Sequence, residues 1–144
     1  MKGETTMPKQ DKFENMKASL IENNEKEYGP EIRKKYGDEA INNSNTHLKG
    51  LTQMQFDKGE EVRILLEETL ASALKTGNPA SCEAQKACEL HKEWLCIFNP
   101  DYNKEYHMDM GELYAEDERF KAHYDKIAPG CAEFLRDAIR IYCK

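Results

Sequence analysis

Cys88 and His91 lie three positions apart and are candidates for metal chemistry in this chain. On a helix, residues at this spacing share one face, so both side chains could reach one metal ion. The sequence indicates no further ligands for such an ion, and both residues lie on an apolar helical stripe. The expected role of the pair is therefore core packing, with His91 hydrogen-bonded inside the protein.

The five cysteines include one thiol placed to react, Cys82, which follows a predicted helix cap at Ser81. A helix N-terminus lowers the pKa of a nearby thiol, whereas most of the other cysteines are interpreted as buried structural thiols. The odd count and the absence of a CxxC pair predict reduced thiols and a cytoplasmic protein. Nucleotide-binding, zinc-protease, carboxylate di-iron and serine-hydrolase motifs are absent from the sequence. We therefore expect neither an enzyme nor a cofactor.

Aromatic side chains are concentrated between residues 94 and 124, which hold seven of the thirteen aromatic residues in the chain. Flat apolar rings with polar tips suit a large, poorly soluble aromatic ligand. An aromatic core with a solvated acidic rim is the alternative interpretation. The candidate ligand-binding residues are His91, Trp94, Phe98, Tyr102, Tyr106, Met110 and Tyr114.

These candidates have different expected roles. Trp94, Phe98 and Tyr106 would supply stacking surface, and Met110 would adapt to the shape of the ligand. The tyrosine hydroxyls would orient polar groups of the ligand, with His91 as a further polar contact.

The charge balance bears on the choice of partner. The chain has 27 acidic and 21 basic residues, a net charge of −6. Direct binding of nucleic acid is not expected, because it requires a basic surface. Residues 101–126 hold eight acidic and four basic residues, which favours neutral or cationic ligands. The longest apolar run, residues 94–98, is far shorter than a membrane span, and no signal peptide is recognisable.

Helical spacing of apolar residues extends through almost the whole chain, and no alternating strand pattern occurs. In the N-terminal part we expect helices over residues 11–27 and 38–48. The first ends at Gly29-Pro30, and Pro30 begins a further helix, because the first helical residue needs no N–H donor. Asp38 is expected to cap the helix that follows it.

The remaining sequence predicts helices with recognisable starts. Thr52 and Gln55 have the spacing of a capping box, and one apolar stripe follows from Val62 to Leu74, with Leu65 included. Further starts are expected at Ser81, Asn103 and Asp117 and after Pro129-Gly130. The prediction is an all-α domain of about six helices.

Five segments of the sequence match a known family: YGDEA at 36–40, HKEWL at 91–95, GELY at 111–114, DERF at 117–120 and PGCAEFLRDAI at 129–139. They resemble the TipA-S drug-recognition domain, the C-terminal half of TipA-like regulators of the MerR class. The resemblance covers residues 25–142 and implies a globin-like fold without haem. It also implies binding of bulky antibiotics, such as thiopeptides, in a cleft between helices.

The polar composition of the N-terminus and the resemblance together predict a division of the chain. Residues 1–10 are expected to form a flexible tail, and residues 51–144 a helical antibiotic-binding core. The helices within residues 11–50 are expected to be mobile until a ligand binds. Three asparagines between residues 42 and 45 make part of that segment a weak helix former.

One departure from the family pattern concerns covalent capture. The type member carries a cysteine shortly after the loop that corresponds to Asn99-Pro100, and this cysteine adds to dehydroalanine groups of thiopeptides. Here the loop continues as Asp101-Tyr102-Asn103, and the nearest thiol, Cys96, precedes it. We therefore expect reversible binding.

The resemblance also bears on partners. In the family, a separate N-terminal winged-helix segment reads DNA, so we expect this chain to be fused to, or produced alongside, a MerR-type DNA-binding region. The sequence also leaves open a free-standing drug-sequestering domain, an alternative translation product and a truncated regulator. Two further functions stay open: a globin-like haem or metal protein using His91 and His107, and a structural protein-interaction domain.

Overall fold

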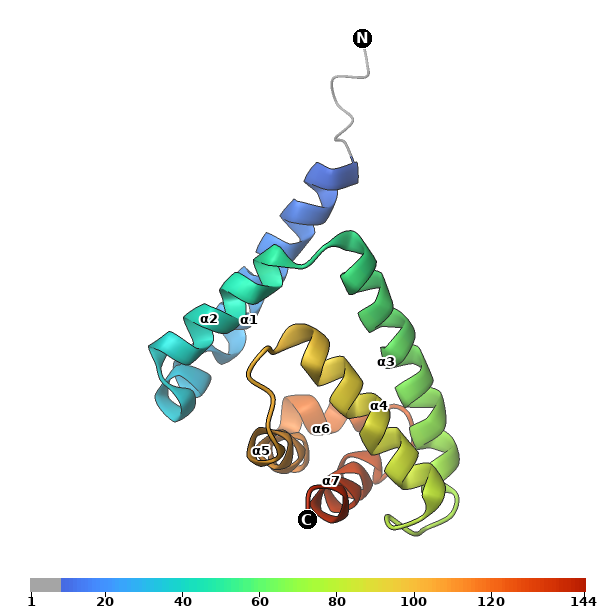
Figure 1. The fold of residues 1–144 in the computed structure, drawn as a ribbon. Coiled ribbons are helices and arrows are strands. Elements are labelled where there is room, and N and C mark those ends of the chain that lie inside the picture. Colours follow the sequence, from blue (N-terminus) through green and yellow to red (C-terminus); the bar gives the residue numbers. More distant parts are fainter. Residues whose placement is uncertain (1–8) are drawn as a thin grey trace. The chain divides into compact units, whose positions relative to one another are not determined.

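The computed structural model describes residues 9–144, so most of the tail predicted for residues 1–10 lies outside the described residues. Within the described range the chain is all-α, as predicted, with seven helices and no strands (Figure 1). No helix in this range is long and apolar enough to span a membrane. The helices are α1 (Lys9–Tyr36), α2 (Asp38–Gly50), α3 (Gln53–Leu74), α4 (Cys82–Phe98), α5 (Lys104–Glu116), α6 (Glu118–Asp125) and α7 (Cys131–Tyr142).

The chain forms two compact units, divided between Phe56 and Asp57 in the first turn of α3. The N-terminal unit consists mainly of α1 packed against α2. The C-terminal unit holds the rest of α3 together with α4 to α7. Each unit is described by itself below.

Helix α1 runs unbroken through Pro30, so the prediction that it ends at Gly29-Pro30 is wrong. Proline removes one backbone donor, and it disfavours helical geometry in the residue before it through a clash with that residue's Cβ. Gly29 has no Cβ, so the second penalty is reduced. The Arg33 guanidinium also binds the Glu25 carboxylate, which joins the turns on either side of Pro30.

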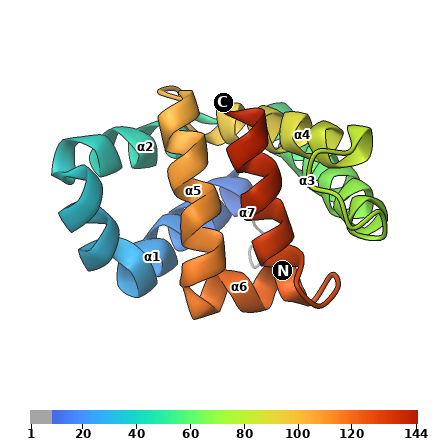
Figure 2. The same cartoon turned by 90° about the horizontal axis from the view of Figure 1, so that it is seen from below.

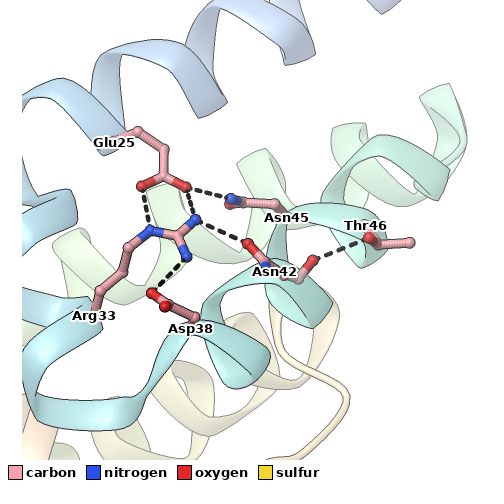
Figure 3. A network of polar contacts seen from close by, with 6 residues as sticks. All are labelled: Glu25, Arg33, Asp38, Asn42, Asn45 and Thr46. Atoms are coloured by element: carbon pink, nitrogen blue, oxygen red, sulfur yellow. Dashed lines mark hydrogen bonds and ion pairs between the residues drawn. The ribbon is translucent and has the colours of Figure 1, made fainter.

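A polar network centred on Arg33 joins α1 to α2 (Figure 3). Arg33 Nε donates to Glu25 Oε1 over 2.9 Å, Nη1 donates to Asp38 Oδ1 over 3.1 Å, and Nη2 donates to Asn42 Oδ1 over 2.9 Å. Asn45 Nδ2 donates to Glu25 Oε2 over 2.8 Å. Asp38 thus serves this network and makes no side-chain cap for α2, contrary to prediction; the cap residue is Gly37, with φ 90°.

The C-terminal end of α2 is held by a buried lysine. Lys17 on α1 is 1% exposed, and its Nζ donates to the carbonyl oxygens of Lys49 and Leu51 over 2.6 and 2.8 Å. An ammonium is well suited to this position, because the last carbonyls of a helix lack intrahelical partners and carry partial negative charge. Lys17 Nζ also forms an ion pair with Glu14 Oε2, at 3.0 Å.

The capping box predicted at the start of α3 is confirmed. The backbone N–H of Gln55 donates to Thr52 Oγ1 over 3.1 Å, and that of Thr52 donates to Gln55 Oε1 over 2.9 Å. The apolar stripe of α3 is narrower than predicted, because Leu65 is half exposed. The helical period places Leu66 and Leu70 in the core and turns Leu65 about 100° away from Leu66.

The caps predicted for the next three helices are also confirmed. Ser81, Asn103 and Asp117 each accept a hydrogen bond from a backbone N–H in the first turn of α4, α5 and α6 respectively. Helices α5 and α7 lie side by side (Figure 2). Gly111 permits their close approach, since a Cβ atom there would lie 3.1 Å from Ile139 Cδ1.

Candidate ligand-binding site

Two histidines are fully buried in the C-terminal unit and bind each other. His91 on α4 and His107 on α5 are both 0% exposed, and His91 Nδ1 lies 2.8 Å from His107 Nε2. Their outer nitrogens each meet a tyrosine hydroxyl. His91 Nε2 lies 3.0 Å from Tyr114 Oη, and His107 Nδ1 lies 2.8 Å from Tyr102 Oη. We call these four residues the His–Tyr relay.

Local structure explains how the four side chains meet. Asn99-Pro100 ends α4, and the Asn103 cap begins α5 shortly after Tyr102. His107 and Tyr114 are seven residues apart, so they lie on the same face of α5, two turns from each other. The relay therefore depends on two helices and the short connection between them.

Burial keeps the relay uncharged at neutral pH. It lowers the pKa of His91 well below the usual value, and the nearby His107 lowers it further. Burial and the ammonium of Lys92 lower the pKa of His107 to about 4. Burial also raises the pKa of Tyr102 to about 12. Both imidazoles are thus neutral, with one N–H donor and one acceptor nitrogen each.

Half-buried aromatic rings of α4 lie next to the relay. The Trp94 ring is parallel to that of His91, with centroids 6.4 Å apart, and lies 4.9 Å from the ring of Phe98. Phe98 in turn packs on α3, where a Cβ at Gly59 would lie 2.9 Å from the Phe98 ring. The ammonium of Lys92 lies 5.5 Å from the ring centroid of Tyr102. These contacts place Trp94 and Tyr102 beside the buried histidine pair, with Phe98 next to Trp94.

The other candidate residues differ in exposure. Tyr114 is 2% exposed and packs on Phe120 and Tyr124, with centroid distances of 5.5 and 4.7 Å. Met110 is partly buried against the same core, and Tyr106 is half buried. His91 and Tyr114 thus lie behind the partly exposed rings. The assignment of all seven residues to ligand binding stays a prediction.

The sequence did not predict His107 as a ligand-binding residue. It indicated His107 only as a candidate haem or metal ligand. A usable signal was its spacing from Tyr114 on the apolar face of α5. A buried histidine at such a position needs polar partners. Its contact with His91 joins residues 16 positions apart, which local spacing does not reveal.

The metal and thiol candidates can be placed as well. Both ring nitrogens of His91 and of His107 are engaged in the relay. Across residues 9–144, no three His, Cys, Asp or Glu side chains are grouped so that they could hold a metal ion. Cys88 is buried, and this raises the pKa of its thiol to about 12. The expected core role of Cys88 and His91 is confirmed, whereas Cys82 and Cys96 are exposed.

Comparison with known proteins identifies the family. A family model described as the TipAS antibiotic-recognition domain matches residues 28–142. The chain belongs to the TipAS family. The resemblance seen in the sequence is thereby confirmed, and the match includes the whole His–Tyr relay. No solved structure matched the chain significantly.

Curated relatives of this TipAS domain are bacterial regulators of transcription. The chain is 29% identical to the HTH-type transcriptional activator mta of Bacillus subtilis, over 98% of this chain and 54% of that protein. It is 30% identical to the HTH-type transcriptional activator TipA of Streptomyces coelicolor, over 78% of this chain and 46% of that protein. The HTH-type transcriptional regulator SkgA of Caulobacter vibrioides is 27% identical over 76% of the chain. The chain thus spans about half the length of these relatives.

Proposed function

We propose that this TipAS domain binds bulky, apolar, aromatic antibiotics and reports their presence to transcription. The observation that carries the proposal is that the half-buried rings of Trp94 and Tyr102 lie beside a neutral, fully hydrogen-bonded histidine pair, with the Phe98 ring next to Trp94. Such a surface combines stacking area with a few polar groups, as ligand sites commonly do. Membership of an antibiotic-recognition family supports the same ligand class.

The proposed ligands are thiopeptide-like or other polycyclic molecules of neutral or positive charge. The net charge of −6 disfavours anionic ligands and direct contact with nucleic acid. We propose that DNA is read by a MerR-type region joined to, or produced with, this domain. The domain binds its ligand without converting it, and a cytoplasmic location follows from a role in transcription. Without a DNA-binding region, the same binding of antibiotic would serve to sequester the drug.

The fluorescence of the single tryptophan tests this function. Titration with a thiopeptide should quench or shift Trp94 emission, because Trp94 is partly exposed beside Phe98. Trp94→Ala should weaken binding at least about tenfold by calorimetry, which corresponds to the loss of an aromatic contact. The control is Ile64→Ala, which removes an exposed apolar side chain from α3. A folded domain that binds neither a thiopeptide nor any member of an antibiotic panel would show the proposal to be wrong.

Binding is proposed to be reversible. The segment Pro100-Asp101-Tyr102-Asn103 contains no thiol, and the exposed Cys96 lies on α4 before it. Intact-mass spectrometry after incubation with a thiopeptide should therefore show the unmodified chain. A stable adduct would contradict reversibility, and its loss in Cys96→Ser would locate the reactive thiol.

We also propose that α1 and α2 become more ordered when a ligand binds. The support is the composition of α2, which has no fully buried residue and contains three asparagines. Helices with few buried apolar contacts open at low free-energy cost. Ligand contacts would then offset the cost of ordering them.

A further inference from the structure

The His–Tyr relay is one continuous line of hydrogen bonds from the core to a partly exposed hydroxyl. At its inner end, the Tyr114 hydroxyl is hydrogen-bonded to Tyr124, which is 8% exposed. The line then passes through His91 and His107 and ends at Tyr102, which is only half buried. Tyr102 is therefore where the relay comes nearest to solvent.

The protons of this line have two self-consistent arrangements. A neutral imidazole donates from one nitrogen and accepts at the other, and a phenol has one hydrogen to donate. If His91 Nδ1–H donates to His107 Nε2, then His107 must carry its own proton on Nδ1. If His107 Nε2–H donates to His91 Nδ1, then His91 must carry its proton on Nε2. Both rings thus hold the same tautomer in either arrangement.

The two arrangements give Tyr102 opposite hydrogen-bonding roles. With both protons on Nδ1, His107 donates to the Tyr102 oxygen, and the Tyr102 O–H is available to an outside acceptor. With both protons on Nε2, the Tyr102 O–H donates to His107, and its oxygen is available to an outside donor. The four ring nitrogens and the Tyr114 hydroxyl keep a hydrogen-bond partner in both cases, because the bond between Tyr114 and Tyr124 reverses with the others.

We propose that Tyr102 is a specificity-determining residue of the ligand site, and that reversal of the relay lets its hydroxyl either donate to or accept from the ligand. This inference rests on the proposed function for the existence of a ligand. A hydroxyl that reverses in this way would satisfy a carbonyl or ring nitrogen as well as an N–H group, so one site would accept antibiotics of different chemistry. The Lys92 ammonium over the Tyr102 ring helps to hold the ring in place.

The chain offers a matched control for Tyr102. The rings of Tyr102 and Tyr142 both meet His107 edge-on, at centroid distances of 5.5 and 5.7 Å and the same interplanar angle of 65°. The Tyr142 hydroxyl instead donates to Glu89 Oε1 over 2.6 Å. Tyr102→Phe therefore removes a relay hydroxyl, whereas Tyr142→Phe removes a hydroxyl outside the relay from an equivalent ring.

The first experiment reads the tautomers of the free domain by ¹⁵N NMR of the histidine rings. His91 and His107 should show the same tautomer, or the same mixture of tautomers. Tyr102→Phe should move both rings together toward Nε2–H, because a buried N–H on His107 Nδ1 would then lack an acceptor. Tyr142→Phe should leave both unchanged. Opposite tautomers, or a change at one ring alone, would overturn the relay without bearing on whether antibiotics bind.

The second experiment compares three bicyclic probes of similar size by NMR titration at pH 7.5. Quinoline offers only an acceptor, indole only a donor, and naphthalene neither. Tyr102→Phe should weaken the binding of quinoline and of indole alike, by about fivefold for one lost hydrogen bond, and leave the affinity for naphthalene unchanged. Tyr142→Phe should change the affinity for none of the three probes.

Three outcomes would overturn the inference: weaker binding of only one of quinoline and indole, equally weakened binding of naphthalene, or no binding of any probe. The thiopeptide titration decides the proposed function separately.

Discussion

At the scale of single residues, the molecule is distinguished by polar groups that are buried but paired. An unpaired buried imidazole or hydroxyl costs about 1–3 kcal/mol, so such groups persist only with good partners. His91 and His107 hydrogen-bond to each other, and the hydroxyls of Tyr114 and Tyr102 pair with their outer ring nitrogens. Polar groups in the core are thus compatible with stability because the neutral forms match in donors and acceptors.

This pairing predicts a loss of stability in mild acid. The pKa of His107 is about 4 in the folded chain against 6.5 for an ordinary histidine, so below pH 6.5 the unfolded chain binds more protons. The free energy of unfolding should therefore fall as pH falls, by about 2 kcal/mol between pH 7.5 and 5 from His107 alone. His91 acts in the same direction. Urea unfolding at several pH values measures this.

Two comparisons isolate the histidine effect. The carboxyl pKa of Glu112 is lowered from 4.5 by the Arg140 guanidinium, so its stabilisation is lost only below about that pH. His123→Gln serves as the control for loss of a histidine outside the buried pair, since the His123 side chain is 56% exposed. A free energy of unfolding that stays constant from pH 7.5 to 5 would show that the pair is not buried in its neutral form.

At the scale of elements, helix ends and helix contacts depend on a few specific side chains. The ends of α2 are an example: Arg33 joins its first turns to α1, and Lys17 binds the carbonyls at its other end. Gly29 contributes indirectly, since a Cβ there would lie 2.7 Å from Glu25 Oε1 and displace the carboxylate that Arg33 binds. Polar side chains of α1 thus provide much of what positions α2, which has no fully buried residue.

Removal of the Lys17 ammonium should weaken this pair of helices. Lys17→Met keeps an unbranched side chain but loses both charge-assisted hydrogen bonds, at a cost of about 2 kcal/mol. Chemical denaturation, followed by amide exchange of α2, measures the loss. Lys12→Met on the exposed side of α1 should have little effect. Equal stability of the two variants would contradict the role given to Lys17.

The contact between α5 and α7 should be sensitive to the size of residue 111. Gly111→Val would push side-chain atoms into Ile139 and should destabilise the domain by about 2 kcal/mol. In an Ile139→Ala background the cost should be much smaller, because space has been made. A double-mutant cycle of unfolding free energies tests this, and strictly additive effects would show that the two residues do not compete for space.

At the scale of the whole molecule, the chain combines two units of different construction. In the C-terminal unit, α7 alone buries six residues, whereas α2 in the N-terminal unit buries none. We expect local stability to differ accordingly, since the opening free energy of a segment follows its buried contacts. The proposed ordering of α2 by a ligand rests on this difference in burial between α2 and α7.

Hydrogen exchange should reveal this asymmetry. In the free chain, amides of α2 should exchange at least about tenfold faster than those of α7. This factor corresponds to a difference of about 1.4 kcal/mol in the free energy of local opening. Addition of a thiopeptide should slow exchange in α2 more than in α7. Equally slow exchange in both helices before ligand is added would contradict the proposed ordering.

Local sequence patterns were enough to predict the helical class, most helix starts and the family. Capping residues such as Thr52, Ser81 and Asn103 act on backbone groups two or three positions away, so local spacing is enough to recognise them. The aromatic segment was equally visible as composition.

Other features of the fold and of the His–Tyr relay depend on tertiary contacts. Continuation of α1 through Pro30 accompanies the Glu25–Arg33 contact across that turn, and the loss of the Asp38 cap follows from its pairing with Arg33. The partnership of His91 with His107 depends on the packing of both α4 and α5 against α7, because residues 16 positions apart are thereby brought together. Such contacts arise from the arrangement of whole helices, and the spacing of residues along the chain does not predict them.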